Sequence, residues 1–204
     1  MTNSVCKYLL SQDIAYDCKD PIVGGVEPNG VIINRDDIDF ANVKFDDNNP
    51  NIITDLPLKN KGYKILQGGK TPFTGTNTAF VEGTYVNTFT HQVSLVVLDN
   101  GADVAKNIID GLANGEFVIV LENNYKGLNK GDGKKGSAAF QIYGYFQGLH
   151  ATEISNDKYS EDTDGGWLVT LEETKSPKSG MFLFKTDYEG SKAAFDALTS
   201  EPSA

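Results

Sequence analysis

The clearest alternation of hydrophobic and polar positions begins near Ala79. In the segment Gln92–Leu98, Val93, Leu95 and Val97 share one side, and this period of two predicts a strand with both faces mostly covered. Runs rich in β-branched and aromatic residues predict further strands at Phe117–Leu121, Phe140–Gln147, Trp167–Thr174 and Met181–Lys185. In the Phe140–Gln147 strand, we expect an exposed side that carries Tyr143 and Tyr145.

The period changes after the turn Asp99-Asn100-Gly101 and predicts a helix over residues 101–114. Its apolar positions recur every three to four residues: Val104, Ala105, Ile108, Ile109 and Leu112. Asn114-Gly115 can end the helix. Because one stripe of this helix is apolar, we expect it to lie on a sheet. A shorter helix is predicted at Ser191–Leu198.

These elements predict a mainly β (α+β) protein, an antiparallel β-sandwich or barrel with one packed helix. Residues 1–75 are rich in Asp, Asn, Gly and Pro and predict an extended N-terminal arm with loops and short strands. Residues 76–186 form the predicted β core, and residues 187–204 a C-terminal segment with the short helix.

The formal charge at pH 7 is −10, and Arg35 is the only arginine. Such a chain is a poor candidate for gripping phosphate backbones, because that requires Lys and Arg side chains. The acidic surplus serves solubility or, if it is concentrated on one face, lets DNA slide past that face.

The longest apolar runs, such as Val93–Leu98 and Phe117–Leu121, are strand-sized. A helix that crosses a membrane needs roughly 20 apolar residues. The first residues show no basic region followed by an apolar stretch of signal-peptide length. We therefore expect no membrane span and folding in the cytosol.

Two motifs suggest ligands, but each departs from its pattern. Gly68-Gly69-Lys70-Thr71 resembles part of a phosphate-binding loop, yet Lys64 stands where the loop needs its first glycine. The segment 160–165 resembles the start of a calcium loop, yet Leu171 stands at the position of the bidentate acid. We predict no nucleotide site, and a solvated acidic turn or a bound cation remain the alternatives at 160–165.

No group of residues has the spacing of a catalytic or metal site. Cys6 and Cys18 are predicted to be free thiols, and with the distant His91 and His150 they do not form a tetrahedral zinc set. Carboxylates on consecutive strand residues, such as Glu172 and Glu173, point to opposite faces of the strand and rarely converge. We therefore predict no catalytic residue, cofactor or metal, and a protein that is not an enzyme.

Two features suggest contacts with other subunits. The Thr-rich stretch Thr84–Thr88 and the tyrosine side of the Phe140–Gln147 strand suit edges that pair with another chain. The lysine-glycine loop at 126–136 is either a solvated hairpin tip or a contact with an acidic neighbouring surface. The predicted oligomer interface consists of Thr84, Tyr85, Val86, Tyr143, Tyr145, Lys130, Lys134 and Lys135.

The order of strand, helix, strand, long hairpin and two further strands over residues 79–185 resembles the tail-tube fold of phage tail tubes and type VI secretion tubes. The opening Ala15–Pro21, followed by Gly24-Gly25-Val26 and Val31–Asn34, resembles the N-terminal arms of structural proteins of Bacteroides phages, including the crAss-like group. Similarity of fold does not by itself fix function.

This resemblance implies a virion structural protein, a ring or tube subunit of a phage tail or neck. It implies a hexameric or dodecameric ring with an acidic lumen, which double-stranded DNA passes without specific binding. The partners would be other copies and neighbouring tail, neck or portal-proximal proteins, and the ring would assemble in the host cytoplasm. The long N-terminal region suggests a neck or tail-barrel ring.

The alternative is a head-decoration or receptor- or carbohydrate-binding module of a virion. It rests on the tyrosine-rich strands and on Trp167, because aromatic faces stack on sugars. Core packing is the other explanation for Trp167.

Overall fold

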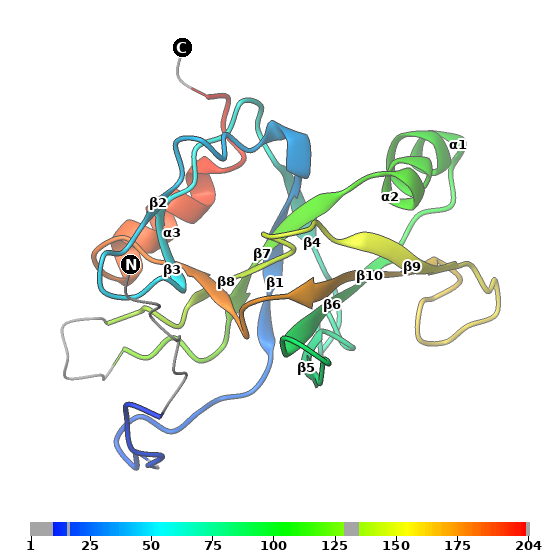
Figure 1. Cartoon of the computed structure of the whole chain (residues 1–204). Coiled ribbons are helices and arrows are strands. Elements are labelled where there is room, and N and C mark those ends of the chain that lie inside the picture. Colours follow the sequence, from blue (N-terminus) through cyan, green and yellow to red (C-terminus); the bar gives the residue numbers. More distant parts are fainter. Residues whose placement is uncertain (1–9, 16, 129–134, 203–204) are drawn as a thin grey trace.

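A computed structural model describes residues 10–15, 17–128 and 135–202 of the chain. Its strands form two sheets, which confirms the predicted mainly β sandwich (Figure 1). The described strands do not close into a barrel, so the sandwich alternative is the right one. No helix in the described ranges is long and apolar enough to cross a membrane.

The larger sheet has seven strands, and only its β3–β11 pair is parallel. Its order is β2 (Lys44–Phe45), β3 (Ile52–Asp55), β11 (Met181–Leu183), β8 (Phe140–Tyr143), β7 (Phe117–Asn123), β1 (Val26–Asn34) and β4 (Tyr63–Leu66). The continuous apolar run of β7 fits its central position, because both faces of this strand are buried.

The smaller sheet has four antiparallel strands in the order β5 (Asn77–Val81), β6 (Thr88–Val97), β10 (Trp167–Ser176) and β9 (His150–Ser155). The chain passes from β8 to β9, and from β10 to β11, and so changes sheet twice at one corner of the sandwich. The strand β9 was not predicted from the sequence.

The predicted helix at 101–114 is present as one continuous helical stretch. It consists of α1 (Ala102–Val104), the π-helical turn η2 (Ala105–Ile109) and α2 (Asp110–Asn114). The second predicted helix is α3 (Tyr188–Ala197), which the Asp187 side chain caps by accepting a hydrogen bond from the Gly190 amide. A short 3-10 turn, η1 (Arg35–Asp37), follows β1.

Two apolar cores lie on opposite faces of the larger sheet. The first, with Val118 and Val120 at its centre, is covered by α3 through Phe195 and by the loops around β2 and β3. The second, with Ile119 and Leu121, fills the space between the sheets and receives Ile109 of the helix. The larger sheet is therefore the middle layer of three.

Both tyrosines that were expected on an exposed strand side are buried. Tyr143 lies in the second core with 5% of its surface exposed, and Tyr145 lies in the first core with 9% exposed. The predicted strand Phe140–Gln147 ends at Tyr143, so Tyr145 lies in the turn after β8 and packs in the other core from Tyr143, not on the same side as the alternation predicted. The prediction of an exposed tyrosine side was wrong for this reason.

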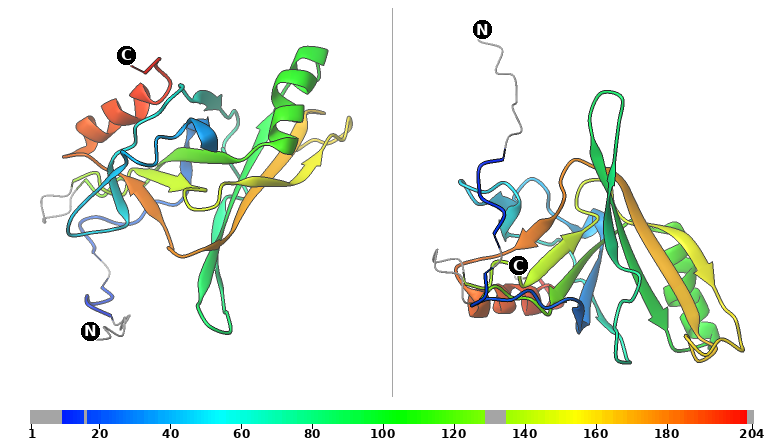
Figure 2. Two further views of the ribbon diagram at one scale, coloured as in Figure 1. Left: turned by 45° about the horizontal axis from the view of Figure 1, so that its top comes forward. Right: turned by 90° about the horizontal axis from the view of Figure 1, so that it is seen from below.

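The predicted N-terminal arm extends over fewer residues than expected. β1 lies between β7 and β4 in the larger sheet, so residues 26–66 contribute strands to the sandwich. The described residues before β1 run away from the body and are mostly exposed (Figure 2). Asn124 ties this segment to the body through Gly24 and Gly25.

Candidate functional site

The outer face of the smaller sheet is the side that points away from the second core. Strand register defines it, because residues paired across an antiparallel ladder share a face. Val93, Leu95, Val169 and Leu171 point inward and are buried. The outer face consists of Asn77, Ala79, Val81, Thr88, Thr90, Gln92, Ser94, Val96, His150, Glu153, Ser155, Leu168, Thr170 and Glu172.

This outer face is polar and carries no Lys or Arg among the residues that the register assigns to it. Its carboxylates are Glu153, which is exposed, and Glu172, which is half-buried. Near the middle of the face, the chain around Gly75 lies over Ser94, and Gln92 donates a hydrogen bond to the Gly75 carbonyl. The residues that the register assigns to this face are therefore mostly hydrophilic and acidic, and the loop that contains Lys70 borders one end of the face.

The two edges of the smaller sheet differ from each other. All five residues of β5 are exposed, and this strand has no charged residue, no proline and an unbroken register with β6. β9 carries Glu153 and has an irregular register with β10. Proteins usually protect exposed strand edges with charges, prolines or bulges. β5 lacks these protections and is the better candidate for pairing with another chain.

A hairpin joins β5 to β6 and projects beyond the body of the protein (Figure 2). It carries the predicted interface residues Thr84, Tyr85 and Val86, all of them exposed at its tip. Two further exposed apolar residues, Phe80 and Val81, precede the tip and were not predicted. These three predicted interface residues therefore lie at the tip of a hairpin and not on a strand edge, and their role in an interface stays a prediction.

A cavity of about 560 Å³ lies at the other end of the same sheet. One wall is the loop that contains Lys70 and Pro72, and the opposite wall is the acidic loop after β9. Val96, Leu98 and Leu168 add apolar surface from β10 and the end of β6. The segment Gly68–Thr71 therefore lines a cavity, but it does not precede a helix as a phosphate-binding loop would.

The described part of the lysine-glycine loop is anchored by a charged cluster. Lys126 contacts Glu27 at 2.8 Å and Glu122 at 3.3 Å, and the Tyr188 hydroxyl donates to Glu122 at 2.7 Å. Burial alone would lower the pKa of Lys126, but the two carboxylates outweigh burial and raise it. Burial, followed by the bond to Glu122, raises the pKa of Tyr188.

Of the three lysines in the predicted interface, Lys135 is exposed. Lys130 and Lys134 lie outside the described residues. Lys126 was expected to belong to the same basic patch, but its ion pairs make it a structural residue.

The two histidines lie in different places and do not approach a shared site. His91 is buried and bonds Thr78 Oγ1 through Nδ1 and the Lys178 carbonyl through Nε2, each at 2.9 Å. His150 is exposed on the outer face. Cys18 is an exposed free thiol, and Cys6 is not among the described residues.

Within the described ranges, no three His, Cys, Asp or Glu residues are grouped so that they could hold a metal ion. The acidic residues of the 160–165 turn, Glu161, Asp162 and Asp164, are exposed, and Asp162 and Asp164 line the cavity. The bound cation that was the alternative at this turn gains no support from the geometry.

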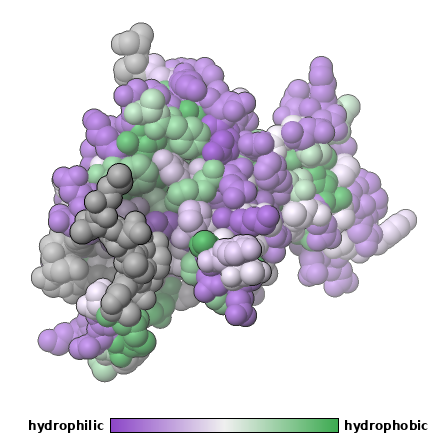
Figure 3. All heavy atoms as spheres, in the orientation of Figure 1, coloured by the Kyte–Doolittle hydropathy of each residue, from purple (hydrophilic) through white to green (hydrophobic). Residues whose placement is uncertain are grey.

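The aromatic residues that motivated carbohydrate binding are largely in the interior. Trp167 is half-buried, packs against the second core, and its indole nitrogen is buried. With Tyr143 and Tyr145 also buried, these three rings do not form an exposed platform. On the face seen in Figure 3, hydrophobic residues form separate patches within a mostly hydrophilic surface.

Comparisons by sequence and by structure found no matching family model, no matching curated protein and no matching solved structure.

Proposed function

We propose that this chain is a structural subunit of a phage tail or neck, which assembles into a ring or tube that conducts DNA. The observation that carries the proposal is the smaller sheet, whose mostly polar and acidic outer face lies between two unlike open edges. The resemblance to the tail-tube fold provides the biological setting. The assembled ring or tube would be part of a virion.

The order of strands in the smaller sheet suits repeated lateral pairing. With four antiparallel strands, β5 and β9 run in opposite directions. If β5 of one copy lies beside β9 of the next, the new pair is antiparallel as well. Because the two edges differ, this contact is heterologous, and such contacts generate closed rings when the rotation closes.

In such a ring, the larger sheet lies outside and the outer face of the smaller sheet lines the channel. Glu153 and Glu172 then give the channel a negative charge, and the acidic residues around the cavity outnumber Lys70 there. DNA would pass without specific binding. The ring would be hexameric or dodecameric and would contact neighbouring tail, neck or portal-proximal proteins.

Electron microscopy of the purified protein at high concentration tests the assembly. We expect rings with a central channel, and mass spectrometry should detect the chain in purified phage particles. A chain that is monomeric at every concentration and absent from particles contradicts the proposal.

A pair of charge variants at Ala79 tests the lateral contact. Ala79 is an exposed residue of β5 on the outer face, and Glu153 lies on the same face of β9. Ala79→Glu should weaken the rings, because like charges on neighbouring strands each cost about 0.2–1 kcal/mol. The matched variant Ala79→Lys should leave them intact. Equal effects of the two variants on ring yield would contradict pairing between β5 and β9.

A further inference from the structure

A second cavity, of about 410 Å³, lies where the chain crosses from the larger sheet to the smaller one. Its walls are the start of β1, the end of β7 and the loop 70–76, which belongs to the connection between β4 and β5. Tyr143 of β8 lines it from the core between the sheets. Residues 70–74 also line the first cavity, of about 560 Å³, but the rest of the two linings differs.

The Tyr143 hydroxyl has no hydrogen-bond partner within the described chain. Tyr143 is only 5% exposed, and buried tyrosine hydroxyls usually find a partner. Three polar side-chain atoms of the described residues are sealed from solvent without a partner, namely Arg35 Nε, Thr163 Oγ1 and Trp167 Nε1. The Tyr143 hydroxyl is not one of them, so it retains access to open space. The cavity that Tyr143 lines is that space.

The polar groups that remain free in this cavity are mainly donors. Its described lining contains no Asp or Glu, and Lys70 is exposed without an ion pair among the described residues. Burial raises the pKa of Tyr143 to about 12, so its hydroxyl keeps its proton and can donate at neutral pH. Six backbone carbonyls of the lining already accept hydrogen bonds from the protein: those of Gly24, Gly25, Thr71, Phe73, Gly75 and Asn123.

The apolar part of the lining is held in a fixed position. It consists of Val26, Pro72 and Phe73. Phe73 is 3% exposed and has a φ of 56°, which residues with a side chain rarely adopt. Such conformations persist where the surrounding structure enforces them, and they are frequent at ligand sites. Because the buried ring anchors the loop, the wall of the cavity is preorganised for a ligand.

We propose that this cavity binds a small organic carboxylate with an apolar body. The Tyr143 hydroxyl and the Lys70 ammonium group would hold the carboxylate, because hydrogen bonds to a charged oxygen are stronger than neutral ones. Val26 and Pro72 would contact the apolar body. One lysine balances a single negative charge, whereas the formal charge of −10 on the chain opposes a doubly charged phosphate. This binding goes beyond the proposed assembly and does not depend on it.

Calorimetric titration of the full chain with benzoate and benzamide tests the proposal. We expect benzoate to bind about tenfold more tightly, because benzamide has nearly the same shape but lacks the charge. Lys70→Gln should remove this preference, and Tyr143→Phe should weaken benzoate binding about fivefold. Lys64→Gln is the matched control, because Lys64 is exposed on β4 and does not line the cavity. Equal affinities for benzoate and benzamide, or equal effects of Lys70→Gln and Lys64→Gln, overturn the proposal.

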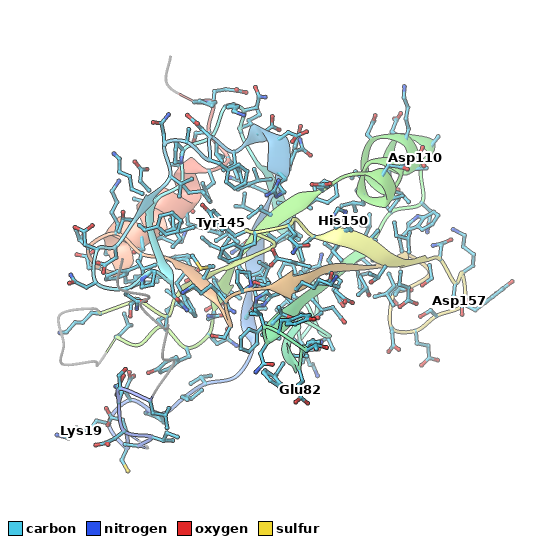
Figure 4. All side chains as sticks on the ribbon, viewed as in Figure 1. Lys19, Glu82, Asp110, Tyr145, His150 and Asp157 are labelled. Atoms are coloured by element: carbon cyan, nitrogen blue, oxygen red, sulfur yellow. The ribbon has the colours of Figure 1, made fainter. Side chains whose placement is uncertain are left out.

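Amide NMR spectra of the chain distinguish this cavity from the first one, because Lys70 lines both. Benzoate should shift the amide signals of Gly24, Gly25 and Gly75 and leave that of Asp157 unchanged. Asp157 lies on the loop after β9, in the wall of the first cavity (Figure 4). A shift at Asp157 without shifts at the three glycines overturns the assignment of the site. These measurements report on binding alone, whereas electron microscopy of rings tests the proposed function.

Discussion

At the scale of single residues, the best-defined polar interaction is at the corner where the chain changes sheet. Glu173 is 1% exposed and accepts hydrogen bonds from the Phe146 amide at 2.8 Å and the Gln147 amide at 2.7 Å. Arg35 donates to the Phe146 carbonyl at 2.7 Å. These side chains satisfy backbone groups that the bend removes from the ladder.

Glu173→Ala should lower the free energy of unfolding by about 1–3 kcal/mol, because it leaves two part-buried amides without their acceptor. The adjacent Glu172→Ala is the matched control, since Glu172 lies half-buried on the outer face and should change stability by about 0.5 kcal/mol or less. Urea unfolding measures both. Equal losses in the two variants would contradict the role given to Glu173.

The burial of Tyr143 leads us to expect that the free energy of unfolding falls at alkaline pH. Burial raises its pKa to about 12, whereas a free tyrosine titrates near 10. As the pH rises, the unfolded chain therefore loses the Tyr143 proton before the folded chain does. The free energy of unfolding is unaffected by this group below about pH 10 and falls as the pH rises from 10 toward 12. At pH 11 the loss should be about 1 kcal/mol.

Urea unfolding at several pH values tests this prediction with Tyr143→Phe, which should lack that part of the alkaline loss. Tyr85→Phe is the matched control, because Tyr85 is 96% exposed at the hairpin tip and lies outside both cores. The prediction is wrong if Tyr143→Phe declines with pH as steeply as the unmodified protein.

At the scale of elements, the helix shows how a local irregularity changes a predicted face. Ile108 and Ile109 were both expected on the apolar stripe. In the structure Ile109 is 6% exposed and Ile108 is 42% exposed, and both lie in the π-helical turn η2. A π turn contains an extra residue, which shifts the phase of the stripe. Ile108 consequently points away from the core.

Truncation of these two isoleucines compares the inner and outer sides of η2. Ile109→Ala should cost about 2–4 kcal/mol in unfolding free energy, because it leaves a cavity in the second core. Ile108→Ala should cost less than about 1 kcal/mol. Thermal unfolding of both variants tests the assignment, and a larger loss for Ile108→Ala would show that the face has been assigned wrongly.

Much of the element pattern could be predicted from the sequence, because periodicity reports which residues share a side. The helix at 101–114 and the strands at Phe117 and Trp167 follow from this signal alone. Periodicity does not report what covers a side. Tyr143 and Tyr145 were therefore expected to be exposed. In the structure, Tyr143 is buried between the two sheets, and Tyr145 is buried in the first core, where it packs against Phe40 and Phe45.

The candidate site was predictable only in part. Thr84, Tyr85 and Val86 were singled out because a Thr-rich stretch suits a strand edge, whereas in the structure they occupy the hairpin tip. The cavity joins residues that are about a hundred positions apart, such as Pro72 and Leu168, and no local pattern reports such pairing. β9 was missed because its alternation is weak, with only Ala151 and Ile154 directed inward.

At the scale of the whole molecule, the acidic charge is unevenly distributed. The helix region 98–116 and the loop 156–166 together carry eight acidic and two basic residues, so six of the ten net negative charges lie in these two segments. Both segments flank the end of the smaller sheet that holds the cavity (Figure 1).

The central claim is that the smaller sheet lines a channel formed by many copies of this chain. Cryo-electron microscopy of the assembled particle tests it most directly. The account predicts a closed ring in the tail or neck, with β5 of each copy beside β9 of the next and with Glu153 and Glu172 facing the channel. Density that places the chain as a monomer on the head surface, or with the larger sheet facing a channel, would contradict it.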